Sequence, residues 1–173
     1  MNYRDEVKRG MSLLARQPNV IFCGQGVSIK ANAMFEQLEG VPKHQRLEVP
    51  VFENTQLGMC LGMSLAGLLP VCLFPRTNFL LLAIDQLVNH LDKWQQMTGK
   101  PAKVIVKTMS GCTRPLDPGP QHSGERLVRG LDLLCGNVLV EDMALASMVY
   151  PAYQNAVKRD SPTLLVERGN LYG

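Results

Sequence analysis

The sequence has no long run of basic residues and no marked excess of either charge. Its 173 residues contain 18 Lys and Arg and 15 Asp and Glu, which gives a formal charge of +3. Such a balance gives little support for nucleic-acid binding. Nothing indicates disorder either, because 46% of the residues are hydrophobic and only 19% are charged. We expect one globular domain over residues 1–173 with a substantial core.

No two cysteines have the CxxC spacing of a metal or redox motif. The five cysteines are an odd set, and three of them lie among apolar residues. They are Cys23, Cys60, Cys72, Cys112 and Cys135. We therefore expect reduced and mostly buried thiols, and no metal site.

We expect no secretory signal at the start of the sequence. The first ten residues, MNYRDEVKRG, are polar and charged, whereas a signal peptide needs an apolar central region. A cytoplasmic location is the default expectation.

Between Glu53 and Arg76 the sequence carries no charge, which raises the question of a membrane span. The uncharged stretch has nearly the length that a span requires. It is interrupted, however, by three glycines and by Pro70, so one continuous helix is not expected. The pattern instead predicts a helix over about 55–67 and a strand over 70–74, with no membrane span.

Two stripes run along the predicted helix at 55–67. Leucines at positions 57, 61, 65 and 68 form an apolar stripe, and Gly58, Gly62 and Ala66 form a stripe of small residues. We expect both faces to be buried. The small residues would then allow another copy of the domain, or a partner, to approach closely.

The rest of the chain alternates between helical and strand patterns. Short apolar strands separated by helices predict an α/β fold with a doubly wound, mostly parallel sheet and helices on both faces. The longest helical pattern covers residues 79–97 and ends just before Gly99. Other helices are expected at 3–17, 32–40, 126–136 and 144–160, and other strands at 19–24, 46–52, 102–108, 137–142 and 162–168.

Ligands of open parallel sheets bind beyond the carboxyl ends of the strands, so the loops there hold the candidate site residues. Three stand out: Glu53, Phe79 and His122. Each also has an ordinary interpretation. Glu53 could be an exposed acid before a helix, Phe79 could be a core residue, and His122 or Ser123 could cap the next helix. The glycine loop at 24–26 lacks the full GxGxxG spacing and is interpreted as a plain turn.

The stretch VFENTQLGMCLGMSLAGLLPVCLF, followed by NFLLLAIDQLVNHLDK, resembles the pyrimidine-binding domain of thiamine diphosphate enzymes. The similarity also includes GPQHS at 119–123 and the closing SPTLLVERGNLYG, so it extends from about Asn19 onward. It is strongest to the beta subunits of pyruvate dehydrogenase-type 2-oxoacid dehydrogenases and to the transketolase group. That family has a parallel sheet with helices on both faces, in agreement with the pattern.

The resemblance implies a role for each candidate residue. Glu53 matches the family glutamate, whose carboxyl group bonds to a ring nitrogen of the cofactor's aminopyrimidine and promotes its imino form. Phe79 matches the aromatic residue that stacks on the pyrimidine ring. His122 matches the histidine that faces the substrate as a proton donor or hydrogen-bond partner.

Family enzymes hold the diphosphate and Mg²⁺ on a second domain with a Gly-Asp-Gly motif, and this sequence contains no such motif. The resemblance therefore implies a diphosphate-binding alpha-type partner that holds Mg²⁺ and shares the cofactor, in a heterotetramer. Family beta subunits also continue into a carboxyl-terminal domain, whereas this sequence stops at Gly173. We expect one piece of a split enzyme or a shortened chain.

Arg76 and Arg114 lie in the two loops that would face a small-molecule substrate. They are interpreted either as contacts to an anionic substrate or as solvated surface residues.

These features predict the pyrimidine-binding, beta-like component of an enzyme that cleaves a carbon–carbon bond next to a carbonyl. A 2-oxo acid is the preferred donor, with acyl transfer after decarboxylation. Two-carbon transfer from a ketose phosphate is the alternative. A non-catalytic assembly or regulatory subunit is a third hypothesis, which the presence of Glu53 disfavours.

Overall fold

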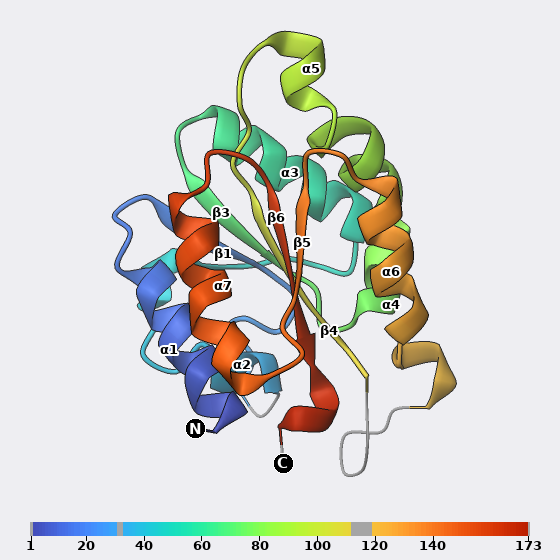
Figure 1. Cartoon of the computed structure of the whole chain (residues 1–173). Coiled ribbons are helices and arrows are strands. Elements are labelled where there is room, and N and C mark those ends of the chain that lie inside the picture. The colour runs from blue at the N-terminus through green and yellow to red at the C-terminus, as the bar shows by residue number, and fades with distance from the viewer. Residues whose placement is uncertain (1, 31–32, 112–118, 173) are drawn as a thin grey trace.

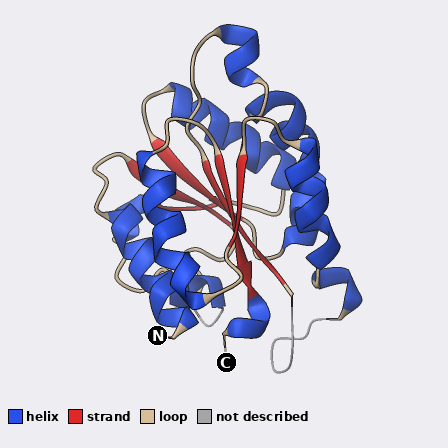
Figure 2. Ribbon diagram, in the orientation of Figure 1, coloured by secondary structure: helices blue, strands red, loops and turns tan. Residues whose placement is uncertain are grey.

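The computed structural model describes residues 2–30, 33–111 and 119–172, and it has six parallel strands between two layers of helices (Figures 1 and 2). The strands are β1 (Val20–Gly24), β2 (Arg46–Glu48), β3 (Leu69–Leu73), β4 (Ile105–Ser110), β5 (Leu139–Asp142) and β6 (Thr163–Arg168). The main helices are α1 (Tyr3–Ala15), α2 (Ala33–Gln37), α3 (Glu53–Leu65), α4 (Thr77–Leu80), α5 (Trp94–Thr98), α6 (Glu125–Leu134) and α7 (Ala146–Lys158).

The strands pair in the order β2-β1-β3-β4-β6-β5, and every pairing is parallel. The predicted doubly wound α/β fold is therefore confirmed. From β1 the next strand in sequence, β2, lies on one side, and from β3 the next strand, β4, lies on the other side. The strand order thus reverses direction between β1 and β3, and ligands bind at such a point in folds of this kind. The carboxyl ends of the strands lie at the lower edge of the sheet in Figure 1.

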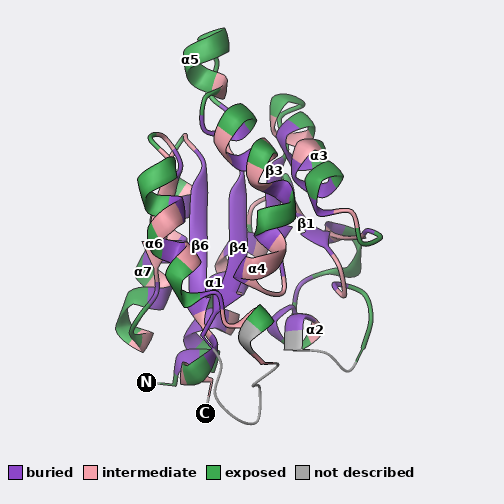
Figure 3. Cartoon of the chain, turned by 90° about the vertical axis from the view of Figure 1, so that its right-hand side faces the viewer, coloured by how far each residue is buried: buried purple, intermediate pink, exposed green. Residues whose placement is uncertain are grey.

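Each face of the sheet has its own core, because successive side chains of a strand point to opposite faces. The first core cluster, on the face covered by α1 and α7, includes Val71, Ile105 and Leu165. The second core cluster, on the face covered by α3 and α6, includes Val106 and Val166. Figure 3 shows the strands buried between these helices.

The apolar stretch at 51–74 forms helix α3 followed by strand β3, as predicted. No helix among the described residues is long and apolar enough to cross a membrane. The expectation that both faces of α3 are buried is wrong for this chain. Ala66 is exposed, and Leu65 and Leu68 retain 46% and 38% of their surface.

The prediction of a single helix at 79–97 is also wrong. Its sequence winds as α4, a 3₁₀ turn (Leu81–Ala83), a π-helical turn (Gln86–Leu91) and then α5. The wider turn keeps Leu87 and Leu91 in the core and directs the next residue, Asp92, inward. One Asp92 carboxylate oxygen accepts three backbone hydrogen bonds at 2.7–3.0 Å, from the nitrogens of Gly136, Asn137 and Val138. The three hydrogen bonds require Asp92 to point inward, and this requirement explains the irregular winding of the helix.

The strand predicted at 46–52 is shorter in the structure, where β2 ends at Glu48. The chain leaves the sheet there because the Glu48 carboxylate accepts hydrogen bonds from the nitrogens of Gly26 (2.6 Å) and Ser28 (2.7 Å). These amides belong to the glycine loop after β1. They bind a side chain of the protein, in agreement with a plain turn.

Cys23 of β1, Cys60 of α3 and Cys72 of β3 are free and buried thiols, as expected. Hydrogen bonding to its two neighbours, together with burial, raises the pKa of Cys60 well above its usual value. Cys135 is also free, and burial raises its pKa to about 11. Cys112 lies outside the described residues.

An ion pair between Lys107 of β4 and Glu167 of β6 lies in the centre of the molecule. The Lys107 nitrogen is 2.8 Å from the Glu167 carboxylate, and the two side chains are 1% and 0% exposed. Tyr153 of α7 donates a hydrogen bond to the carboxylate at 3.2 Å, and Tyr172 donates one at 2.7 Å. Gln37 of α2 accepts from Lys107 and donates to Glu167 at 3.1 Å. This buried network thus joins two strands, two helices and the end of the chain.

We predict that Glu167→Gln lowers the free energy of unfolding by about 3–5 kcal/mol, because it leaves the Lys107 ammonium buried without a counter-charge. Urea denaturation monitored by circular dichroism measures the loss. Glu39→Gln is the matched control, because the Glu39–Lys8 pair is on the surface, with Glu39 74% exposed. An equal denaturation midpoint for both variants would contradict the structural role of the network.

Candidate functional site

Glu53 is the first residue of α3 and follows β2 by five positions. Its residue surface is only 6% exposed, so the interpretation as an exposed acid is wrong. Among the described residues, none donates a hydrogen bond to its carboxylate or forms an ion pair with it. The amino end of the helix favours a negative charge and so offsets part of the cost of burial. The residue is thus largely buried, although its carboxylate oxygens are not among the fully buried polar atoms that lack a partner in the described parts of the chain.

Phe79 and His122 come together from loops after two neighbouring strands, β3 and β4. Phe79 lies in α4, and His122 ends a 3₁₀ turn (Pro120–His122). Their ring centroids are 5.3 Å apart with an interplanar angle of 80°, which is an edge-to-face contact. Phe79 also packs against the second core cluster, as its ordinary interpretation expected.

Backbone geometry explains why these two rings meet. The Gly111 nitrogen donates a 2.6 Å hydrogen bond to the Ser123 oxygen, which brings the chain back to the end of β4. Gly124 then adopts a positive φ of 59° and lies so close to α4 that a Cβ atom would be 2.8 Å from the Asn78 side chain. Only glycine fits such a close approach without strain. Gly124 thus fixes the start of α6 beside α4.

Neither His122 nor Ser123 caps α6. The residue at the N-cap position is Gly124, and no side chain provides a cap hydrogen bond. The capping interpretation of both residues is therefore wrong, and the His122 ring is directed to Phe79 instead.

Helix α3, which begins with Glu53, packs against the 3₁₀ turn that directly follows α4. The helix that starts with the carboxylate and the helix that carries Phe79 are thus neighbours on the same face of the sheet. No group of three His, Cys, Asp or Glu side chains in the described parts of the chain is arranged to hold a metal ion.

Arg76 is half-buried at the N-cap position of α4, three residues before Phe79. It lines a cavity of about 300 Å³ at the carboxyl edge of the sheet. Arg114 lies outside the described residues.

Sequence reasoning missed the charged pair Lys107 and Glu167, which line the same cavity. A signal was present, since each is a charged residue next to the apolar centre of a predicted strand. Opposite charges in two buried strands suggest pairing, because an unpaired charge in a core is very costly.

Residues 3–173 match the family described as "Transketolase, pyrimidine binding domain". The chain belongs to this family. The match spans nearly all of the chain and confirms the resemblance to the pyrimidine-binding domain of thiamine diphosphate enzymes.

Similar curated proteins are subunits of a 2-oxoacid dehydrogenase. The chain is 27% identical over 172 residues to "Pyruvate dehydrogenase E1 component subunit beta" of Chaetosphaeridium globosum, with 92% of this chain and 49% of the relative covered. It is 24% identical over 177 residues to the mitochondrial subunit of the same name from Homo sapiens, with 98% and 48% covered. The transketolase-type pyrimidine-binding domain thus spans about half the length of the curated relatives it matches.

Among solved structures, the chain is similar to "Split gene transketolase, inactive beta4 tetramer". The TM-score is 0.73 at 14% identity, and the similarity covers 97% of this chain and 51% of that one. At this identity the likeness shows the shared fold alone.

Proposed function

We propose that this pyrimidine-binding domain is the beta-like component of a multi-subunit, thiamine diphosphate-dependent enzyme. The observation that carries the proposal is the Glu53 carboxylate, which belongs to a residue only 6% exposed and has no partner among the described side chains. A largely buried glutamate beyond the carboxyl end of a parallel strand lies where ligands of such sheets bind, which is typical of a functional site.

The chemistry of the described residues fits the pyrimidine end of the cofactor. When bound, thiamine diphosphate supplies an acidic ring carbon that, once deprotonated, attacks the carbonyl carbon of the substrate. Glu53 would share a proton with a ring nitrogen of the pyrimidine. Phe79 would pack against the flat face of that ring, and His122, held edge-to-face by Phe79, would donate a proton or hydrogen bond to the substrate.

We assign the reaction as decarboxylation of a 2-oxo acid with transfer of the acyl group. The names of the pyruvate dehydrogenase relatives support this choice. Two-carbon transfer from a ketose phosphate is the second candidate, favoured by the family description. A non-catalytic subunit would have no need for a largely buried glutamate at position 53, so we place that function last.

The proposal requires a partner of the alpha type, with a Gly-Asp-Gly motif that holds the diphosphate and Mg²⁺. A heterotetramer is the proposed assembly, and a cytoplasmic location remains our default proposal. The exposed face of α3 offers a contact surface, since a Cβ atom added at Gly62 would meet nothing within 4 Å and Leu65 is 46% exposed.

The isolated chain is predicted to bind thiamine diphosphate and Mg²⁺ with negligible affinity, because its residues fit only the pyrimidine end. Isothermal titration calorimetry on the purified chain measures this directly. Addition of the diphosphate-binding subunit should restore binding. Tight, Mg²⁺-dependent binding to the chain alone would contradict a shared cofactor site.

Gly62→Leu is predicted to weaken assembly by roughly five- to a hundredfold, because a large side chain overpacks a close helix contact. The single chain should fold normally, since the space beside Gly62 is open. Light scattering and sedimentation measure the assembly. The matched control is Gly130→Leu in α6, where the space is also open. If Gly62→Leu assembles like this control, α3 is not at an interface.

Glu53→Gln is predicted to slow turnover of the assembled enzyme by about 10²–10⁴-fold while cofactor binding changes much less, because the amide cannot exchange the proton. Hydrogen–deuterium exchange at the cofactor's acidic carbon, followed by NMR, should slow in parallel. His122→Ala should leave this exchange largely intact and impair turnover. The control is Glu39→Gln, at an exposed position beyond α2.

Unchanged exchange and turnover in Glu53→Gln would exclude the proposed role of the carboxylate. The assembly-subunit function would then become the better proposal.

A further inference from the structure

Gln56 is a polar residue on the buried face of α3, three positions after Glu53. It is 0% exposed, and residues three apart on a helix are neighbours on the same side. Its amide nitrogen Nε2 donates hydrogen bonds to the Leu73 oxygen at 3.0 Å and to the Cys72 sulfur at 3.4 Å. A flipped amide would place its oxygen against the Leu73 carbonyl, so the hydrogen bonds fix the orientation of this side chain.

The start of α3 lacks a capping side chain. The N-cap residue is Phe52, and no described side chain forms a cap hydrogen bond there. A helix start without a cap leaves backbone nitrogens unsatisfied and tends to fray. The Gln56 nitrogen donates a hydrogen bond to the Phe52 oxygen at 2.9 Å, so Gln56 closes the turn that contains Glu53. Its side chain therefore anchors this turn to the sheet.

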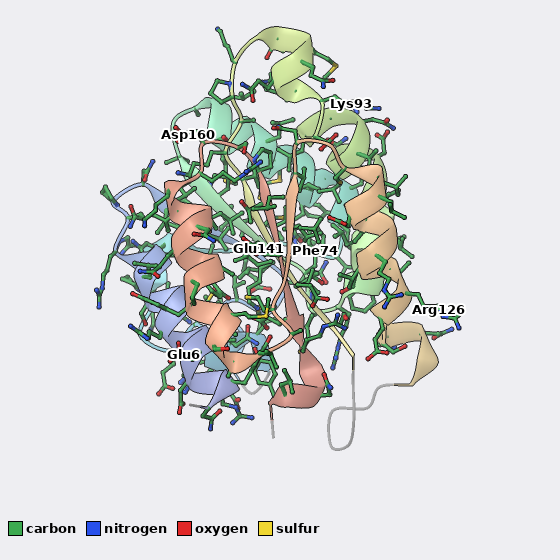
Figure 4. All side chains as sticks on the ribbon, in the orientation of Figure 1. Glu6, Phe74, Lys93, Arg126, Glu141 and Asp160 are labelled. Carbon is green, nitrogen blue, oxygen red and sulfur yellow. The ribbon has the colours of Figure 1, made fainter. Side chains whose placement is uncertain are left out.

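The anchor point is a firmly held part of the sheet. Leu73 is the last residue of β3 and is 0% exposed. The next residue, Phe74, lies in the interior of the molecule (Figure 4), and its nitrogen donates a hydrogen bond to the Lys107 oxygen of β4 at 2.9 Å. The chain then continues into α4, which carries Phe79. One side chain thus connects the helical turn of Glu53 to the strand that leads to Phe79.

We propose that Gln56 is a positioning residue, which sets the place of the Glu53 carboxyl group relative to the Phe79 ring. The inference rests on the proposed function, in which these two groups hold the same pyrimidine ring. Catalysis depends steeply on geometry, and a misplacement of about 1 Å can cost roughly a hundredfold in rate. Gln56 acts through Glu53 and supplies no group to the reaction.

Gln56→Met keeps the length of the side chain and removes the whole amide group. The amide oxygen Oε1 is buried and has no hydrogen-bond partner in the described parts of the chain. An unsatisfied buried acceptor is unfavourable, so its removal offsets part of the loss of the hydrogen bonds from Nε2. This variant should therefore fold.

Gln45 provides a matched control at the opposite edge of the sheet. It directly precedes β2, so it lies at the amino edge, whereas Glu53 follows the carboxyl end of that strand. It is 8% exposed, and its amide nitrogen donates a hydrogen bond to the Ala15 oxygen at 3.1 Å. Its amide oxygen is also buried without a partner among the described residues. Gln45→Met therefore removes the same kind of bond away from Glu53.

The anchor can be tested in the isolated chain by amide hydrogen exchange followed by NMR. Gln56→Met should speed exchange of the backbone amides at positions 56 and 57 by roughly two- to tenfold, because a hydrogen bond that holds the turn is lost. Gln45→Met should leave these amides unchanged. Urea denaturation should show a similar midpoint for both variants, which separates local opening from a general loss of stability.

In the assembled enzyme, Gln56→Met should slow both turnover and deuterium exchange at the cofactor's acidic carbon by about ten- to a hundredfold. The affinity for thiamine diphosphate should change much less, because Glu53 and Phe79 are both retained. Gln45→Met should leave exchange, turnover and affinity unchanged. A purely structural role of Gln56 would instead affect the two variants alike.

Two results would overturn the proposal. They are unchanged amide exchange at positions 56 and 57, and equal exchange at the cofactor carbon in Gln56→Met and Gln45→Met. If Glu53→Gln itself leaves exchange at that carbon unchanged, the proposed function fails and the positioning role fails with it, even where amide exchange shows the anchor. Should Gln56→Met not fold, Gln56→Asn replaces it in both tests with the same expected changes, because its amide is one methylene too short to span the same distance.

Discussion

The buried ion pair of Lys107 and Glu167 is the constraint on which the carboxyl edge of the sheet depends. Removing two charges from water is costly, and the cost is recovered only when every remaining donor and acceptor finds good geometry. Here the hydrogen bonds that offset this cost come from distant parts of the sequence, namely from Gln37, Tyr153 and Tyr172. The pair therefore selects one position for α2, α7 and the last residues of the chain.

The tyrosines of this network keep their phenolic protons and so remain hydrogen-bond donors. Burial raises the pKa of Tyr153 and Tyr172 well above the usual value, and the nearby Glu167 carboxylate raises both further. Tyr3, whose pKa burial also raises, accepts a hydrogen bond from the Arg168 nitrogen at 2.9 Å and donates one to the Met143 oxygen at 2.9 Å. Protonated phenols thus connect the first helix to the end of β6 near neutral pH.

Sequence pattern predicts the parts of this protein that depend on local periodicity. Alternating apolar strands and helices were enough for the parallel α/β fold, and the interrupted apolar stretch at 51–74 was enough for α3 and β3. The winding of residues 77–98 could not be predicted, because Asp92 turns inward to bind backbone nitrogens 44 to 46 positions away. Local periodicity carries no information about hydrogen bonds to residues so far away in the sequence.

The candidate site also has parts that the sequence predicts and parts that it does not. Glu53, Phe79 and His122 came from a motif in fixed order, whereas their ordinary interpretations came from local rules, and the structure excludes the exposed acid and the histidine cap. The cavity could not be predicted, because it forms only where loops after β1 and β3 meet two strands that are not consecutive in the chain.

The cavity and the start of α3 differ in how this chain satisfies their charges. At the cavity, Lys107 and Glu167 neutralise one another within the buried network. At the start of α3, by contrast, Glu53 is largely buried and has no counter-charge among the described residues. A carboxylate in this position gains most from a ligand that donates a hydrogen bond, and such a gain is larger in a site closed to water. The far end of α3, with Leu65 exposed and open space at Gly62, offers a surface to a second chain. The proposed contact surface and the proposed proton exchange at Glu53 are therefore separate features of one helix, because Gly62 and Leu65 lie at the opposite end of α3 from Glu53.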